Sequence, residues 1–239
     1  MTMRQPLVLF TSVWVVVAVL CGCSTSQPLP DFGYLSPDRF EQEIRAFEAG
    51  DAEAMPPENA LLFVGSSSIR MWHKTLAEDM APLTVIGRGF GGSNANDLLH
   101  FYGRIVLKYQ PRAVVIYEGD NDVDQGITPL GILATYERLL DRIKTDLPGC
   151  RVYLLAVKPS PMRWALWPTM LEVNEGLAEL ADERKSVVYI DIATPMLGED
   201  GKPRADLFIQ DNLHLNRRGY QLWRNTIRPV LIEVEKEHE

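Results

Sequence analysis

The sequence predicts an α/β protein in which a parallel sheet of five strands is covered by helices on both faces. Three observations support this: a globular composition, apolar runs at a regular pace, and helix-like stretches between them. The chain has 239 residues, 46% of them hydrophobic and 23% charged, which excludes a disordered, collagenous or coiled-coil chain. A net charge of −8 argues against nucleic-acid binding as the main function.

The strand predictions rest on five apolar runs that are continuous rather than alternating, as in parallel strands covered on both faces. They are Ala60–Val64, Leu83–Ile86, Ala113–Tyr117, Val152–Val157 and Val187–Ile190. The expected helices are residues 37–49, Ile69–Glu78, Asn94–Tyr109, Pro129–Leu147, Pro168–Lys185 and Arg217–Glu235. This alternation predicts a three-layer α/β/α sandwich with a doubly wound, flavodoxin-like sheet.

The first 22 residues are expected to be a leader. Arg4 precedes an apolar run from Leu7 to Leu20, which is short for a membrane span. The run ends in Leu20-Cys21-Gly22-Cys23, which resembles the lipobox of bacterial lipoproteins. The resemblance implies that residues 1–22 are a signal peptide and that Cys23 carries acyl chains, which anchor the protein in a membrane. An uncleaved or simply cleaved leader is the alternative.

On this interpretation, residues 23–36 form a lipidated tether, and residues 37–239 form one domain. The expected location is the bacterial cell envelope. Ser24 after the lipidated cysteine fits the periplasmic side of the outer membrane in a host with two membranes, although inner against outer membrane stays open. Three cysteines are too few for a disulfide scaffold, and we expect Cys150 to pack rather than react.

Polar and glycine residues follow several predicted strands, at the edge where sheets of this kind bind ligands. The segments are Gly65-Ser66-Ser67-Ser68, Gly87 to Ser93, Glu118 to Asp122, and Asp211-Asn212-Leu213-His214. This clustering is the first indication of a functional site.

Hydrolysis by a serine needs a hydroxyl, a base and a group that orients the base. Ser66, Ser67 or Ser68 could supply the hydroxyl, although a serine between a strand and a helix is most often only an N-cap. His214 could act as the base, with Asp211 three residues earlier as its partner.

The reaction also needs hydrogen-bond donors for the oxyanion. The backbone N–H of Gly92 and the side-chain amide of Asn121 are candidates.

Two competing motifs are weak. Gly87-x-Gly89-x-x-Gly92 has the form of a dinucleotide fingerprint, but the next acidic residue after a strand, Glu118, lies 26 residues past Gly92 rather than about 20. Asp120-x-Asp122-x-Asp124 partly matches a calcium loop, but Gly126 and Gly131 stand at the wrong positions.

Taken in order, four segments resemble the blocks of the SGNH hydrolases, also called the GDSL lipase/esterase family. They are Gly65-Ser66-Ser67-Ser68 for Gly-Asp-Ser-Leu, Arg88 to Ser93, Gly119-Asp120-Asn121-Asp122, and Asp211-x-x-His214. The match spans residues 60–220. Ser66 and Ser68 depart from the first block, and Gly87 stands where many relatives carry Asn, but none of these three residues is an assigned catalytic group.

The resemblance implies a serine esterase or acylhydrolase that needs neither a cofactor nor a metal. Ser67 would be the nucleophile, His214 the base and Asp211 its orienting partner. The oxyanion hole would combine the N–H groups of Ser67 and Gly92 with the Asn121 amide.

The substrate is expected to be a small carboxylic ester: a short acyl ester, an acetylated sugar or a lysophospholipid. Candidate residues for the rim of the substrate cleft are Arg70, Trp72, Arg88, Phe90 and Trp164, the last from the Pro-rich aromatic segment 158–167. The expected partners are this ester and a membrane, through the N-terminal lipid; the oligomeric state stays open. The alternative function is a non-catalytic envelope lipoprotein that kept the fold for ligand binding.

Overall fold

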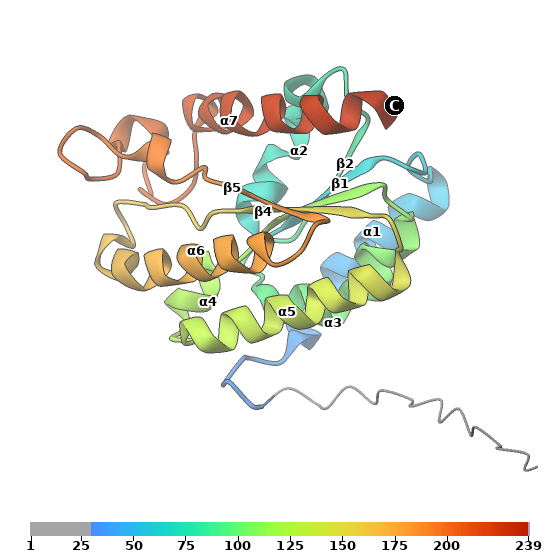
Figure 1. The fold of residues 1–239 in the computed structure, drawn as a ribbon, viewed down its shortest axis with the longest axis horizontal. Helices are drawn as coiled ribbons and strands as arrows, with labels where there is room; N and C mark the ends of the chain where they lie inside the picture. The colour runs from blue at the N-terminus through green and yellow to red at the C-terminus, as the bar shows by residue number, and fades with distance from the viewer. Residues whose placement is uncertain (1–29, 239) are drawn as a thin grey trace, which may run out of the picture.

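The computed structural model describes residues 30–238, so the predicted signal peptide and Cys23 lie outside the described residues. Five parallel strands form one sheet in the order β2-β1-β3-β4-β5 (Figure 1). Their bounds are β1 Leu61–Gly65, β2 Val85–Gly89, β3 Ala113–Tyr117, β4 Arg151–Leu155 and β5 Val187–Ile190. The chain moves from β1 to β2 and then crosses to the other side of β1 for β3. The topological switch point therefore lies between β1 and β3.

Helices cover both faces of the sheet, and this confirms the predicted three-layer architecture (Figure 1). Helices α2 and α7 lie on one face, and α1, α3, α5 and α6 lie on the other. The α-helices are α1 Glu41–Glu53, α2 Ser67–Met80, α3 Ala95–Ile105, α4 Asp120–Asp124, α5 Pro129–Asp146, α6 Trp167–Asp182 and α7 Arg217–Glu235. The 3-10 turns are η1 Pro37–Phe40, η2 Leu107–Tyr109, η3 Trp164–Leu166, η4 Thr194–Met196, η5 Ala205–Leu207 and η6 Lys236–His238.

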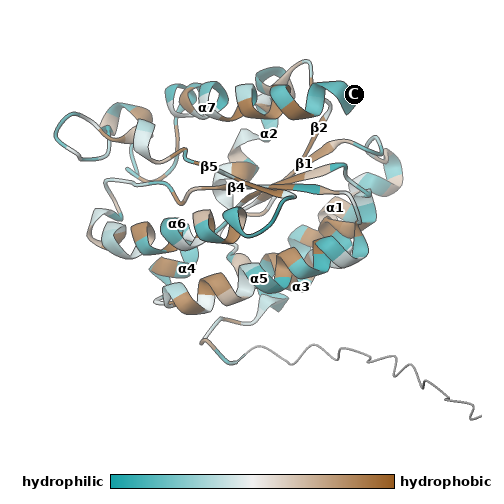
Figure 2. Cartoon of the chain, in the orientation of Figure 1, coloured by the Kyte–Doolittle hydropathy of each residue, from teal (hydrophilic) through white to brown (hydrophobic). Residues whose placement is uncertain are grey.

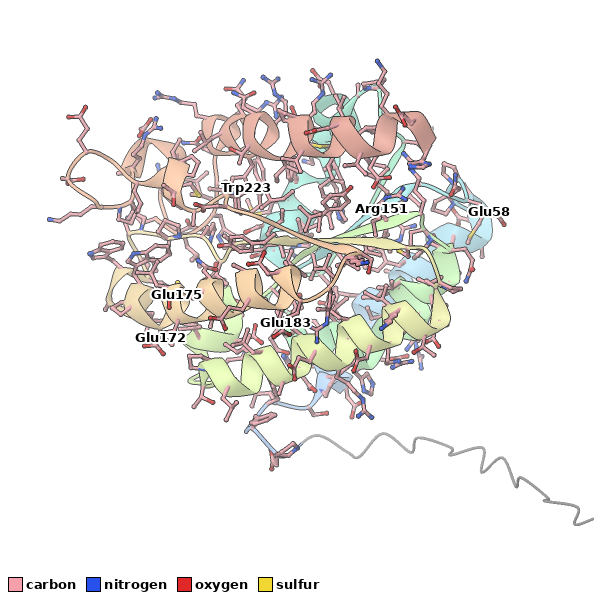
Figure 3. All side chains as sticks on the ribbon, viewed as in Figure 1. Glu58, Arg151, Glu172, Glu175, Glu183 and Trp223 are labelled. Atoms are coloured by element: carbon pink, nitrogen blue, oxygen red, sulfur yellow. The ribbon has the colours of Figure 1, made fainter. Side chains whose placement is uncertain are left out.

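The strands form where the sequence is continuously apolar. Every residue of β1 and β3 is buried, whereas the edge strands β2 and β5 are buried only in part. Hydrophobic residues accordingly concentrate in the strands, and the helices carry both hydrophobic and hydrophilic residues (Figure 2). Trp223 of α7 is fully buried and projects toward the sheet, while Glu172 and Glu175 of α6 and Glu183, just after its end, are exposed (Figure 3).

Most expected boundaries differ from the structure by a few residues, the helix expected over 37–49 is the η1 turn followed by α1, and α4 was not predicted. Two of the differences have a visible local cause. The predicted helix 94–109 is two elements, because the backbone leaves helical geometry at Val106 before the η2 turn begins. The second strand begins at Val85 rather than Leu83. The N–H of Leu83 donates instead to the carbonyl of Met80, in the turn that follows α2.

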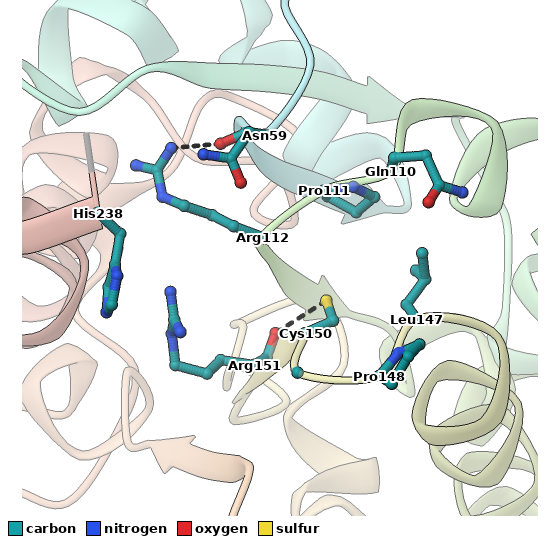
Figure 4. Close-up of a pocket in the computed structure, with 10 residues that line it drawn as sticks. Asn59, Gln110, Pro111, Arg112, Leu147, Pro148, Cys150, Arg151 and His238 are labelled. Atoms are coloured by element: carbon teal, nitrogen blue, oxygen red, sulfur yellow. Dashed lines mark hydrogen bonds between the residues drawn. The ribbon is translucent and has the colours of Figure 1, made fainter.

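The amino ends of β3 and β4 surround a cavity of about 510 Å³ (Figure 4). Its two arginines, Arg112 and Arg151, both pair with the buried Glu235 at the end of α7. These contacts tie the last helix to the sheet. Cys150 is buried beside them, and burial raises the pKa of its thiol to about 12, so it packs as expected. This cavity lies at the opposite end of the strands from the glycine and serine loops.

Among residues 30–238, no helix combines the length and the apolar character required to cross a bilayer.

Candidate active site

Ser67 begins helix α2, two residues after strand β1 ends at Gly65, and Ser66 between them is the N-cap. The turn depends on Gly65, which has a φ of +145° and whose added Cβ would lie 2.2 Å from the carbonyl oxygen of Tyr117 in β3. Only a residue without a Cβ can approach the neighbouring strand so closely. Ser66 and Ser68 are each 2% exposed, whereas Ser67 is half-buried. Of the three hydroxyl-bearing residues, Ser67 is therefore the accessible one.

The imidazole of His214 joins Ser67 to Asp211 across 147 residues of sequence. Its Nε2 lies 3.0 Å from the Oγ of Ser67, and its Nδ1 lies 2.6 Å from the Oδ2 of Asp211. When Nδ1 carries the proton and donates a hydrogen bond to the carboxylate, Nε2 is left as an acceptor for the serine O–H. This is the arrangement by which an imidazole can take a proton from a hydroxyl.

Local backbone geometry explains the Asp-x-x-His spacing. The Oδ1 of Asp211 accepts hydrogen bonds at 2.9 Å from the backbone N–H groups of Leu213 and His214. The loop therefore turns back on the carboxylate and leaves Oδ2 for the imidazole. Partial burial raises the pKa of Asp211, but hydrogen bonds from the His214 side chain and from these N–H groups outweigh it and lower that pKa to about 2. Asp211 is thus a carboxylate at neutral pH.

The loop that carries this pair is anchored at its base by Asn216. The Asn216 side chain accepts hydrogen bonds from the first turn of α7 and donates to the carbonyl oxygens of Asp206 and Phe208. The N–H of Ile209 also donates to the carbonyl oxygen of His214 at 2.9 Å. These contacts hold the imidazole in place.

The two other predicted donors lie in loops that contact this region. The N–H of Phe90 donates to the carbonyl of Gly65 at 2.9 Å, which places the loop after β2 beside the Ser67 turn. Gly92 in that loop is exposed and has a φ of +90°. Asn121, in α4 after β3, donates through Nδ2 to the carbonyl of Ser93 at 2.8 Å. The structure thus brings the loops of all four blocks to the carboxyl edge of the sheet.

The buried carboxyl groups of Asp122 and Glu118 accept hydrogen bonds from these loops. Asp122 accepts hydrogen bonds from the N–H groups of Gly119 and Ala95 and from the hydroxyl of Tyr34. The hydroxyl of Ser93 donates to Glu118 at 2.6 Å. Burial raises the pKa of Glu118 well above its usual range and that of Asp122 to about 6.

Three of the predicted rim residues were wrong. Trp72 and Phe90 are 0% and 1% exposed, so a substrate at the surface cannot touch them. Trp72 lies five residues after Ser67 in α2, which turns it to a different face of the helix, toward the core; there its indole N–H donates to Asp79. The guanidinium of Arg88 is held by Asp51 of α1 and by the hydroxyl of Tyr109, so it is directed to these residues rather than to the Ser67 turn.

Arg70 and Trp164 remain candidates for the rim. Arg70 is exposed, and its guanidinium packs against the backbone of Gly91 in the loop after β2. Trp164 is partly buried and stacks on Trp167 with ring centroids 5.9 Å apart. Contact of either residue with a substrate stays a prediction.

The glycine motif after β2 serves packing. A Cβ at Gly87 would lie 2.4 Å from the ring of His73, and one at Gly89 would lie 2.3 Å from the backbone nitrogen of Arg70. Both glycines therefore allow α2 to approach β2 closely. Burial lowers the pKa of His73 to about 4, so its neutral ring can accept the Gly89 N–H at 3.0 Å. Within the described residues, no three His, Cys, Asp or Glu side chains are grouped to hold a metal ion.

Arg163, in the segment after β4, was not among the residues predicted for the site. Arg163 reaches the third block, where its guanidinium bonds Asp120, Asn121 and Asp124. Its only signal in the sequence was its place in a loop that follows a strand.

Comparison with known proteins identifies this arrangement. The model of the GDSL-like lipase/acylhydrolase family matches residues 58–222, which include Ser67, Gly92, Asn121, Asp211 and His214. The chain belongs to this family. GDSL-like acylhydrolases hydrolyse esters, and the protein is accordingly an ester-hydrolysing hydrolase.

Solved structures share the fold. A protein from Streptococcus pneumonia described as a candidate platelet activating factor aligns with a TM-score of 0.72 at 19% identity, over 81% of this chain and 93% of its own. A GDSL-like lipase from Bacteroides thetaiotaomicron aligns with a TM-score of 0.65 at 20% identity, over 83% and 98% of the two chains. A carbohydrate esterase family 3 protein from Talaromyces cellulolyticus aligns with a TM-score of 0.59 at 19% identity, over 74% and 99%. No match was found among curated proteins.

Proposed function

We propose that this GDSL-like hydrolase is a serine esterase that cleaves small carboxylic esters through an acyl-enzyme on Ser67. The observation that carries the proposal is the hydrogen-bonded series Ser67–His214–Asp211, with distances of 3.0 Å and 2.6 Å. Its members come from opposite ends of the described chain, and a protein that only binds ligands has no need of all three together.

In the proposed mechanism, the Oγ of Ser67 attacks the ester carbonyl while the Nε2 of His214 takes the hydroxyl proton. Asp211 holds the imidazole in the required tautomer and stabilises the imidazolium that forms. The N–H groups of Ser67 and Gly92 and the Asn121 amide donate to the oxyanion. The imidazolium then protonates the leaving alcohol. Water, deprotonated by the same imidazole, hydrolyses the acyl-enzyme and releases the carboxylic acid.

The proposed substrates are esters of short acyl groups, with acetylated sugars as the first class to test. The likeness to a carbohydrate esterase supports this choice. The accessible Arg70, which lies against Gly91 in the loop after β2, supports it as well. A screen of acetylated sugars, short aryl esters and lysophospholipids would rank the three classes. Turnover of lysophospholipids alone would contradict the preference for acetylated sugars.

The activity itself is tested with p-nitrophenyl acetate and purified residues 24–239. Ser67→Ala and His214→Ala should each lower kcat by a factor on the order of 10⁵–10⁶. Ser66→Ala and Ser68→Ala are the matched controls, because these neighbours are buried and should retain turnover. An inactive Ser66→Ala or Ser68→Ala variant beside an active Ser67→Ala variant would refute the assignment.

We also propose that the protein is a lipoprotein of the bacterial envelope, anchored through Cys23. The support is the sequence Leu20-Cys21-Gly22-Cys23 after an apolar run. Cys23→Ser should release the protein from the membrane fraction, and continued membrane retention of that variant would contradict the lipid anchor.

A further inference from the structure

Arg163, in the loop after β4, forms hydrogen bonds with the third block, Gly119-Asp120-Asn121-Asp122. Arg163 lies one residue before η3, and its side chain is 11% exposed. Its Nη1 donates at 3.1 Å to the Oδ1 of Asn121 and at 3.1 Å to the carbonyl of Asp120, and its Nη2 lies 2.7 Å from Asp124. One guanidinium therefore contacts three residues of α4, the helix that carries the candidate oxyanion donor.

These contacts determine which way the Asn121 amide faces. Its Nδ2 donates to the carbonyl of Ser93 at 2.8 Å, while its Oδ1 accepts from Arg163. Rotation of the amide by half a turn would place its oxygen against the Ser93 carbonyl and its NH₂ against the guanidinium, and both contacts would be repulsive. Arg163 therefore favours the orientation in which the Asn121 NH₂ lies beside Ser93, in the loop after β2. Since Nδ2 carries two hydrogens, one serves Ser93 and the second can serve a substrate oxygen.

A buried charge cluster holds the guanidinium. Asp120 is 5% exposed and accepts hydrogen bonds from both Lys158 and Arg163. Burial raises the pKa of Asp120, but the charges of these two cations outweigh it and hold that pKa below its usual range. Asp120 is thus an ionised partner that holds the guanidinium in place, and Asp124, whose side chain is 47% exposed, contributes less.

We propose that Arg163 is a positioning residue that orients the Asn121 amide toward the oxyanion. The role rests on the proposed esterase function. A fixed donor of this kind costs no reorganisation when negative charge develops on the substrate oxygen. Arg163 thus acts on the transition state through Asn121 rather than by touching the substrate.

A double-mutant cycle with Asn121 tests the role. Arg163→Met should lower kcat for p-nitrophenyl acetate by about 10–100-fold, below the roughly 10²–10³-fold of losing a whole oxyanion donor, with little change in KM. In an Asn121→Ala background the same substitution should change kcat by less than about threefold, because coupled residues are not additive. Arg104→Met is the control; Arg104 forms ion pairs with Glu41 and Glu48 on a different part of the fold.

Arg163→Lys is the second variant, for the case in which the methionine variant does not fold. It keeps a cation for Asp120 but lacks the planar fork that reaches Asn121 as well, so its kcat should also fall, again only when Asn121 is present. Equal losses in both backgrounds, or full activity of both variants, would overturn the role. With Ser67→Ala inactive in the same assay, the esterase function would stand; an active Ser67→Ala variant would refute the esterase function instead.

Discussion

Asp211→Asn isolates the electronic role of the carboxylate from its structural role. In the native loop, Oδ1 is held by two backbone N–H groups at 2.9 Å. The asparagine carbonyl oxygen can take that position, because it accepts the same bonds. The amide nitrogen then takes the place of Oδ2, which lies 2.6 Å from the Nδ1 of His214.

The consequence is a change of tautomer. An amide NH₂ facing Nδ1 makes that nitrogen an acceptor, so the ring proton moves to Nε2. Nε2 then donates toward Ser67, 3.0 Å away, and can no longer take its proton. In Ser-His-Asp triads this substitution costs about 10⁴ in kcat, which corresponds to about 5 kcal/mol of transition-state stabilisation.

The assay is steady-state hydrolysis of p-nitrophenyl acetate, with thermal unfolding to show that the variant folds. Asp206→Asn is the matched control, since Asp206 is an acidic residue shortly before the same loop whose side chain pairs with Arg204 and Arg218; it should retain native kcat. A folded Asp211→Asn variant whose kcat stays within about tenfold of the native value would refute the tautomer argument.

Two further predictions concern stability. Gly65→Ala should lower the free energy of unfolding by at least about 2 kcal/mol in urea denaturation, because its Cβ would lie 2.2 Å from the Tyr117 carbonyl oxygen. Gly126→Ala is the control, since Gly126 has a φ of +80° but open space around it, and it should destabilise the protein less. Equal losses of unfolding free energy would contradict the predicted clash. Burial raises the pKa of Glu118 well above 4.5. The folded state therefore keeps a proton on Glu118 at pH values where the unfolded state releases it. The stability that this proton contributes is lost as pH rises above about 4.5. Glu118→Gln should therefore make the fall in unfolding free energy between pH 5.5 and 7.5 shallower by up to about 1.4 kcal/mol per pH unit, and an unchanged slope would contradict the raised pKa.

The fold was predictable because its signals are local. Continuous apolar runs indicated buried parallel strands, and the loops after them indicated the edge at which a site would lie. The pairing of Asp211 with His214 could be proposed because the two residues are three apart. From the residues alone, three serines were equal candidates; the resemblance to the family selected Ser67, and the structure shows that its neighbours are buried.

Other features depend on contacts that a linear sequence does not display. Trp72 lies close to Ser67 in the chain, but the helix places its side chain in the core. Arg88 forms an ion pair with Asp51, and the sequence gives no sign of this contact. Arg163 contacts Asn121 from 42 residues along the chain, and no spacing rule connects a loop arginine with an amide at that distance. Proximity in sequence was therefore a poor guide to the substrate rim.

The most direct measurement of the central claim is intact-protein and peptide mass spectrometry after reaction with a fluorophosphonate, which labels activated serines. We expect one adduct, which fragmentation of the peptide places on Ser67 itself, and its loss in His214→Ala, because without the imidazole the hydroxyl is not activated. Labelling of Ser66 or Ser68 in place of Ser67, or undiminished labelling of Ser67 without His214, would contradict it.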